Sequence, residues 1–213
     1  MRYNVINHLA AAYYDNNCSY LEIGVEHPEN CFNLINALKK CSVDPQKTRP
    51  EVHIDYQMTS DEFFEKLRNK KTEFEPDHKW DIIFIDGLHL ADQVYRDIQN
   101  AINHCKGFVV LHDCSPENFY NAHSDYKFFK ENGGAWCGTT WKAFYKFRTE
   151  TNLKTYTVDI DYGIGVIEMN SEGTPIKLDN PWFEYGKFKN NMTLDLGLIT
   201  PIQFINDHPI KEY

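Results

Sequence analysis

An aspartate, a glycine and a histidine follow a strongly apolar run in residues 81–89, DIIFIDGLH. Such a run is typical of a central parallel strand that is covered on both faces. Asp86 would then stand at the end of the strand, with His89 three residues further on. Because a histidine titrates near neutral pH, it can accept the proton of a reacting hydroxyl. We expect Asp86 to face a ligand, and we expect His89 to be the catalytic base that takes the proton of the hydroxyl.

A second polar pair ends another apolar run, GFVVLHD at 107–113. His112 competes with His89 for the role of base, and Asp113 follows it directly. Structural explanations stay open for all of these residues. An acid at a strand end often caps the next helix, His89 could be a first-turn surface residue, and His112 could be a satisfied core group.

The elements that would position these residues alternate between strands and helices. The patterns predict helices over 3–14, 28–40, 59–70, 90–104 and 138–150, strands over 19–25, 41–45, 52–57, 81–86 and 107–113, and a hairpin over 155–160 and 163–169. Alternation of this kind predicts an α/β fold, a doubly wound, mostly parallel seven-stranded sheet with helices on both faces. The antiparallel hairpin would close its C-terminal edge.

The whole chain, 1–213, is expected to be one domain with a core of about 3–170. The extension 171–213 has no clear period, and its role is open. Residues 114–137 are long for a plain connection, which indicates a functional loop. In doubly wound sheets, ligands bind beyond the carboxyl ends of the strands.

Polar residues follow all five predicted parallel strands, which a purely structural domain does not need. In chain order they are Glu22 and Gly24, Asp44, Ser60 and Asp61, Asp86 and His89, and His112 and Asp113.

The segments LEIGV, VDP, MTSDEFF, FIDGLH and LHD, in this order, resemble the class I S-adenosylmethionine-dependent methyltransferases. Over roughly residues 3–167 the resemblance is to a small branch related to macrocin-type and other sugar O-methyltransferases. It implies a Rossmann-like fold and S-adenosylmethionine as cofactor. The cofactor-binding residues that it implies are Glu22, Gly24, Val25, Asp44, Ser60, Asp61, Asp86 and Gly87.

Within that set, the resemblance places Asp44 on the ribose hydroxyls, Ser60 and Asp61 at the adenine, and Asp86 beside the sulfonium. It also implies a divalent cation, Mg²⁺ or Mn²⁺, held by Asp86 and Asp113. Magnesium prefers oxygen ligands, whereas manganese tolerates a nearby imidazole better. The chain departs from the family in GVEHPENC, where Gly24 is the only glycine of the usual glycine-rich loop.

The resemblance also implies methyl transfer to a hydroxyl of a sugar, a glycan or a glycosylated small molecule. Trp136, Asp125 and Tyr120 are candidate substrate residues, because rings stack on sugar faces and carboxylates bind hydroxyls. A catechol or phenol acceptor and an inactive cofactor-binding module are the alternatives. A nicotinamide oxidoreductase would need a GxGxxG after the first strand, which the sequence lacks.

The net charge of −9, from 22 basic and 31 acidic residues, disfavours nucleic acid and anionic membranes as partners. No apolar stretch approaches the roughly 20 residues that cross a bilayer. The six cysteines show no metal spacing, and we see no export signal. We therefore expect a cytoplasmic protein that acts on a small molecule or carbohydrate, with a homo-oligomer as an open possibility.

Overall fold

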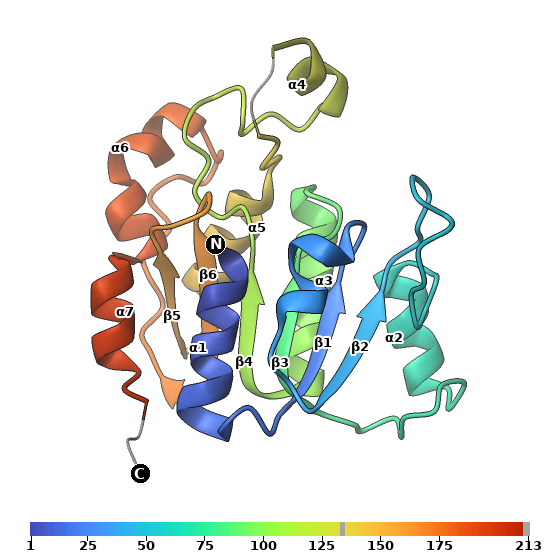
Figure 1. Ribbon diagram of the computed structural model, residues 1–213. Helices are drawn as coiled ribbons and strands as arrows, with labels where there is room; N and C mark the ends of the chain where they lie inside the picture. Colours follow the sequence, from blue (N-terminus) through green and yellow to red (C-terminus); the bar gives the residue numbers. More distant parts are fainter. Residues whose placement is uncertain (133–134, 211–213) are drawn as a thin grey trace.

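A computed structural model describes residues 1–132 and 135–210 (Figure 1). Its centre is a seven-stranded sheet in the order β2-β1-β3-β4-β6-β5-β7. The strands are β1 Ser19–Ile23, β2 Lys39–Val43, β3 Trp80–Ile85, β4 Cys105–Leu111, β5 Leu153–Val158, β6 Ile164–Glu172 and β7 Leu198–Ile199. The first four are parallel to one another, and β6 runs antiparallel between β4 and β5. This confirms the predicted seven-stranded doubly wound sheet and its antiparallel hairpin.

Helices cover both faces of this sheet. The helices are α1 Arg2–Tyr14, α2 Ser60–Arg68, α3 Ala91–His104, α4 Tyr126–Asn132, α5 Thr140–Glu150, α6 Tyr185–Leu196 and α7 Pro201–Asp207, and all but α4 pack on a face of the sheet. The helix α2 begins where the sequence indicates, because Thr59 and Glu62 form a reciprocal capping box. A second box, between Thr200 and Gln203, starts α7.

Two apolar cores follow from the alternation of side chains along the strands. Leu21, Ile83 and Val109 point to one face, where they pack against α2, α3, α5 and α6. Tyr20, Ile82 and Val110 point to the other face, where they pack against α1 and α7. The position of α1 matters for the site, because its N-terminal end lies at the carboxyl edge of the parallel strands (Figure 1).

The predicted helix over 28–40 is wrong. Only two short 3₁₀ turns form there, Pro28–Asn30 and Phe32–Leu34, and β2 begins at Lys39. The side chain of Asn7 on α1 accepts from the backbone N–H of Asn36 at 2.8 Å and donates to the carbonyl of Leu34 at 2.9 Å. These bonds use backbone groups that a helix would need for itself.

The predicted strand over 52–57 is also wrong. Its remnant is a single bridge between Val43 and Tyr56. The carboxylate of Asp55 accepts from both the backbone N–H and the hydroxyl of Ser42, at 2.9 and 2.6 Å. The Asp55 side chain thus occupies the Ser42 N–H of β2, which would otherwise donate to the backbone of a strand beside β2.

The segments that the sequence left unassigned contain regular structure. The loop after β4 carries α4, which lies above the carboxyl edge of the sheet (Figure 1). The C-terminal extension supplies α6, β7 and α7, and β7 joins the sheet beside β5. His208, just after α7, connects distant elements, because its ring nitrogens lie 2.7 Å from the hydroxyls of Tyr13 and Tyr156.

Candidate active site

The backbones of the β1 and β3 tips lie against each other at Gly24 and Gly87. Gly24 has a φ of +86°, and a Cβ on it would stand 2.3 Å from the carbonyl oxygen of Asp86 and from the Cα of Gly87. Only a glycine fits this conformation and this close approach. The contact fixes the start of the segment that follows β3, and with it the direction of the Asp86 side chain.

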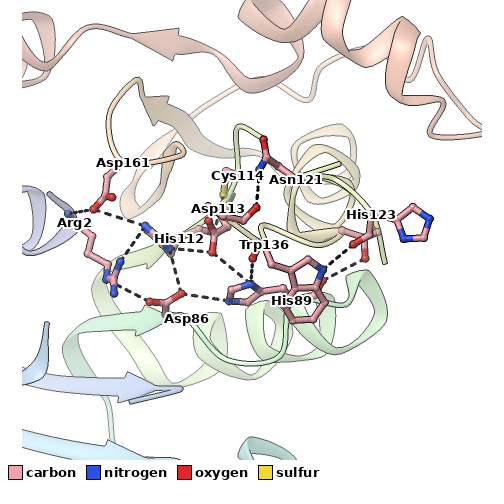
Figure 2. A network of polar contacts seen from close by, with 12 residues as sticks. Arg2, Asp86, His89, His112, Asp113, Cys114, Asn121, His123, Trp136 and Asp161 are labelled. Carbon is pink, nitrogen blue, oxygen red and sulfur yellow. Dashed lines mark hydrogen bonds and ion pairs between the residues drawn. The ribbon is translucent and has the colours of Figure 1, made fainter. Parts of the chain in front are cut away.

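Asp86, His89 and Asp113 meet just beyond the ends of β3 and β4 (Figure 2). His89 Nε2 lies 3.5 Å from an oxygen of Asp86, and His89 Nδ1 lies 3.4 Å from an oxygen of Asp113. Nδ1 also donates to the carbonyl of Trp136 at 2.7 Å. Because a carbonyl can only accept, Nδ1 carries the hydrogen, and Nε2 is the nitrogen that can take a proton or a ligand.

His112 lies between the same two acids. Its Nδ1 is 3.0 Å from an oxygen of Asp113 and 3.3 Å from an oxygen of Asp86. The residue is 6% exposed. The sequence-predicted residues Asp86, His89, His112 and Asp113 therefore form one cluster, with His112 on its inner side.

Arg2 and Asp161 complete this cluster, and the sequence analysis identified neither. Arg2 Nε lies 3.3 Å from Asp86, and its backbone N–H donates to Asp161 at 2.7 Å. Asp161 also lies 3.7 Å from His112 Nε2. Figure 2 shows Arg2 reaching between the two acids. Asp161 follows β5 at the carboxyl edge of the sheet, so its place after a strand was a usable signal. Arg2 offered none.

These contacts control the ionisation of the cluster. Burial alone would raise the pKa of Asp86, but the nearby cations, His112 foremost, hold that pKa well below its usual range. Burial alone would lower the pKa of His89 and His112, but the surrounding carboxylates outweigh it and raise both. The nearby His112 ring, 3.7 Å away, lowers the pKa of Asp161 to about 2. Each of these acids is thus matched by a neighbouring cation.

The donor set suits a divalent cation. One ligand atom each from Asp86, His89 and Asp113 lies within 4.8 Å of the others. Two carboxylates and one imidazole form a mixed set that Mn²⁺ accepts readily and that Mg²⁺ accepts with water in the remaining positions. A cation bound there would compete with Arg2 and His112 for the carboxylates of Asp86 and Asp113.

The first predicted cofactor residues lie at the tips of β1 and β2. Glu22 is 2% exposed and accepts a hydrogen bond from the hydroxyl of Tyr20. Burial raises the pKa of Glu22 to about 8. Val25 is buried beside Gly24. Asp44 accepts from the backbone N–H of Glu26 at 3.1 Å and also from that of Gln46, so it ties the two tips together.

Ser60 and Asp61 do not join the cluster. The hydroxyl of Ser60 donates to buried Asp97 at 2.6 Å, and Asp61 pairs with Arg96 at 3.3 Å. Both side chains therefore bind residues of α3. Their contacts account for the packing of α2 against α3 without a ligand.

Of the predicted substrate residues, Trp136 lies at the cluster. Its indole stacks on His89, with ring centroids 5.2 Å apart and planes 27° apart. Tyr120 is 50% exposed on the same loop and stacks on Phe128. Asp125 accepts from the backbone N–H of Lys127 and so supports the start of α4.

Several solved structures share this fold. An O-methyltransferase from Bacillus cereus in complex with S-adenosylhomocysteine (SAH) is 12% identical, with 77% of this chain and 79% of that chain covered and a TM-score of 0.50. Cofactor-bound Rv0187 from MTB is 13% identical, with 79% and 80% covered and a TM-score of 0.51. TomG of Streptomyces achromogenes, an O-methyltransferase of tomaymycin synthesis in complex with S-adenosylmethionine (SAM), is 10% identical, with 79% of each chain covered and a TM-score of 0.50.

At these identities the similarity establishes the fold. The chain has the Rossmann-like fold of SAM-dependent O-methyltransferases, as the sequence predicted. Two of these structures contain SAH or SAM. No protein-family model matches the chain, and no curated protein does. Among the described residues, no helix combines the length and apolar character that crossing a membrane requires.

Proposed function

We propose that this protein is a SAM-dependent O-methyltransferase. The observation that carries the proposal is the cluster of Asp86, His89 and Asp113 at the carboxyl edge of a methyltransferase fold. It lies directly beside the tip where Gly24 and Gly87 meet. That edge is where doubly wound sheets bind their ligands.

The cofactor would supply a methyl group that is already activated, so the chain has to position the acceptor and remove its proton. We assign the cofactor to the tips of β1 and β2, with bare backbone at Gly24 and Gly87. The carboxylate of Asp44 retains lone pairs beyond its two backbone contacts, and these are available to ribose hydroxyls. Glu22, Val25 and Asp86, with Ser60 and Asp61 near the adenine, complete the assignment from the resemblance.

Two histidines are candidate bases for the acceptor proton, and a divalent cation is the alternative to a base. His89 Nε2 is the candidate base, because Nδ1 is occupied by the carbonyl of Trp136. His112 is the competitor, but it is deeper and lies between two acids. A divalent cation held by Asp86 and Asp113, with His89 as a further ligand, would acidify a bound hydroxyl. The donor set fits this ion, and Asp86 and Asp113 then serve as ligands rather than as partners of the histidines.

The acceptor that we propose is a hydroxyl of a sugar, a glycan or a glycosylated small molecule. Trp136 supports it, since its indole lies on His89 and its loop carries the exposed ring of Tyr120. Apolar sugar faces stack on such rings. A catechol or phenol would use the same rings, and it is the second candidate acceptor.

A thermal-shift series with SAH tests the cofactor assignment, with NAD as control and with EDTA, Mn²⁺ or Mg²⁺ added. A ligand at about 100 times its dissociation constant stabilises by about 2.7 kcal/mol, which raises the melting temperature by about 5–10 °C in a domain of this size. We expect SAH to stabilise the protein and NAD to have no effect. If SAH gives no shift, the carboxyl edge serves another ligand.

Methyl transfer is then measured as SAH release with a panel of glycosides and phenols, for the wild type and for Asp113→Asn. We expect Asp113→Asn to lose turnover and to keep its affinity for SAH. Cofactor binding without turnover on any acceptor would favour the inactive cofactor-binding module.

A further inference from the structure

A second groove lies outside the candidate active site, between α3 and α5. It has a volume of about 520 Å³, and its lining includes Tyr95 and Arg96 of α3, Lys142 and Lys146 of α5, and Phe183. This volume is in the range of small-molecule sites. In the described chain, none of these five side chains contacts Asp86, His89 or Asp113, so the groove is separate from the cluster.

The groove carries positive charge in an acidic protein. Arg96, Lys142 and Lys146 line it, against one lining carboxylate, Asp92. Arg96 is paired with Asp61 at 3.3 Å. Within residues 1–132 and 135–210, no carboxylate lies within ion-pair distance of Lys142 or Lys146. The chain has 31 acidic and 22 basic residues. Among the residues that the structure describes, two lysines without a carboxylate partner in one groove therefore stand out, and they favour an anionic ligand there.

Lys142 and Lys146 are held against aromatic rings instead. Lys146 Nζ lies 4.2 Å from the centre of the Tyr95 ring, and Lys142 Nζ lies 5.5 Å from the centre of the Trp141 ring. Burial lowers the pKa of Lys142, because its ammonium group loses water without gaining a counter-ion. An anion in the groove would supply that counter-ion.

The lining residue Phe183 has a strained backbone. Its φ is +49°, a left-handed conformation that is an outlier for a bulky residue. The ring is held in place edge-on to Tyr145, at 5.9 Å, and to Trp141, at 6.4 Å. Such strain persists only where the surroundings fix it, and it gathers at functional sites. Here it keeps an aromatic ring in the lining of a basic groove.

We infer that this groove binds a phosphorylated small molecule that carries a ring, of the nucleotide type. Lys142, Lys146 and Arg96 bind its phosphates, and its ring lies against Phe183 or Tyr95. Lysine ammonium groups are general phosphate ligands, and arginine adds a two-pronged donor. The site is distinct from the methyl-transfer site and does not depend on it.

Isothermal titration of the full chain with ADP, adenosine and inorganic pyrophosphate tests the inference, with saturating SAH present to occupy any adenine site of the cofactor. We expect ADP to bind and adenosine to bind at least tenfold more weakly. We expect Lys142→Gln/Lys146→Gln to weaken ADP at least tenfold. The matched control is Lys66→Gln/Lys71→Gln, which removes two exposed lysines elsewhere and should change ADP affinity less than twofold.

Pyrophosphate that binds as tightly as ADP would refute recognition of a ring and leave only an anion site. No binding of ADP and pyrophosphate at millimolar concentration, or equal ADP affinity in the groove variant and the control, would overturn the inference. Lys142 is half-buried, so the melting temperature of each variant is measured first. The exposed single change Lys146→Gln gives a second test, with a smaller expected loss of about threefold.

Discussion

Replacing Asp97 by asparagine should stabilise the protein at neutral pH. Asp97 lies on α3, is 1% exposed, and accepts from Ser60 at 2.6 Å and from Gln93 at 3.1 Å, both through Oδ1. Burial raises its pKa to about 6, from an ordinary value of 3.8. An asparagine keeps the shape and the accepting oxygen but carries no charge to bury.

The magnitude follows from the shift of the pKa. A difference of roughly two units, at about 1.4 kcal/mol per unit, makes the ionised residue cost up to about 3 kcal/mol in the folded state. The folded state binds the extra proton, so this acid lowers the stability of the wild type as the pH rises from about 4 to 6. Asp97→Asn should therefore be more stable than the wild type by about 1–3 kcal/mol at pH 7, and the difference should vanish near pH 3.5.

Urea unfolding followed by tryptophan fluorescence at several pH values measures this difference. Asp92→Asn is the matched control, because Asp92 is exposed in the first turn of the same helix. Removing the charge of Asp92 should lower the free energy of unfolding by some tenths of a kcal/mol, because an acid in the first turn interacts favourably with the helix N-terminus. A variant at Asp97 that is destabilised by the same amount at every pH would refute the reasoning, since only the hydrogen bonds would then matter.

Three further changes test the cluster and the strand tips. Gly24→Ala should lower the free energy of unfolding by at least 2 kcal/mol in urea titrations, because its Cβ would overlap the carbonyl of Asp86 at a positive φ; unchanged stability would contradict the close contact. Asp44→Ala should weaken SAH by about tenfold in isothermal titration, and equal affinity would rule out the ribose assignment. Arg2→Ala should tighten Mn²⁺ severalfold in metal titrations, since it removes a cation from Asp86; unaltered Mn²⁺ affinity would argue against Asp86 as a ligand.

Strands β3 and β4 were predictable because each is apolar along most of its length and is followed by a polar residue. DIIFID shows this most clearly, and all six residues of β3 are buried. The two segments that were predicted wrongly, 28–40 and 52–57, lack regular structure where side chains bond to backbone groups outside their local sequence. The side chain of Asn7 accepts from the backbone N–H of Asn36, and the carboxylate of Asp55 accepts from the backbone N–H of Ser42. Local patterns contain no information about such partners.

The candidate site divides in the same way. Asp86, His89, His112 and Asp113 were predictable, since parallel strands bring their ends to one edge. Ser60 and Asp61 match the motif, yet their side chains bind Asp97 and Arg96 in the structure. The cofactor role of these two residues stays a prediction.

The bond from Arg2 to Asp161 joins residues 159 positions apart. Such a contact closes only when α1 and the segment after β5 have come together, and closing so long a loop costs conformational entropy. The cluster therefore cannot reach its final geometry until α1 and the hairpin of β5 and β6 have docked on the same sheet. Ligand binding at this edge would then require the complete fold. In a refolding experiment, the ability to bind ligand should return after most of the secondary structure has formed.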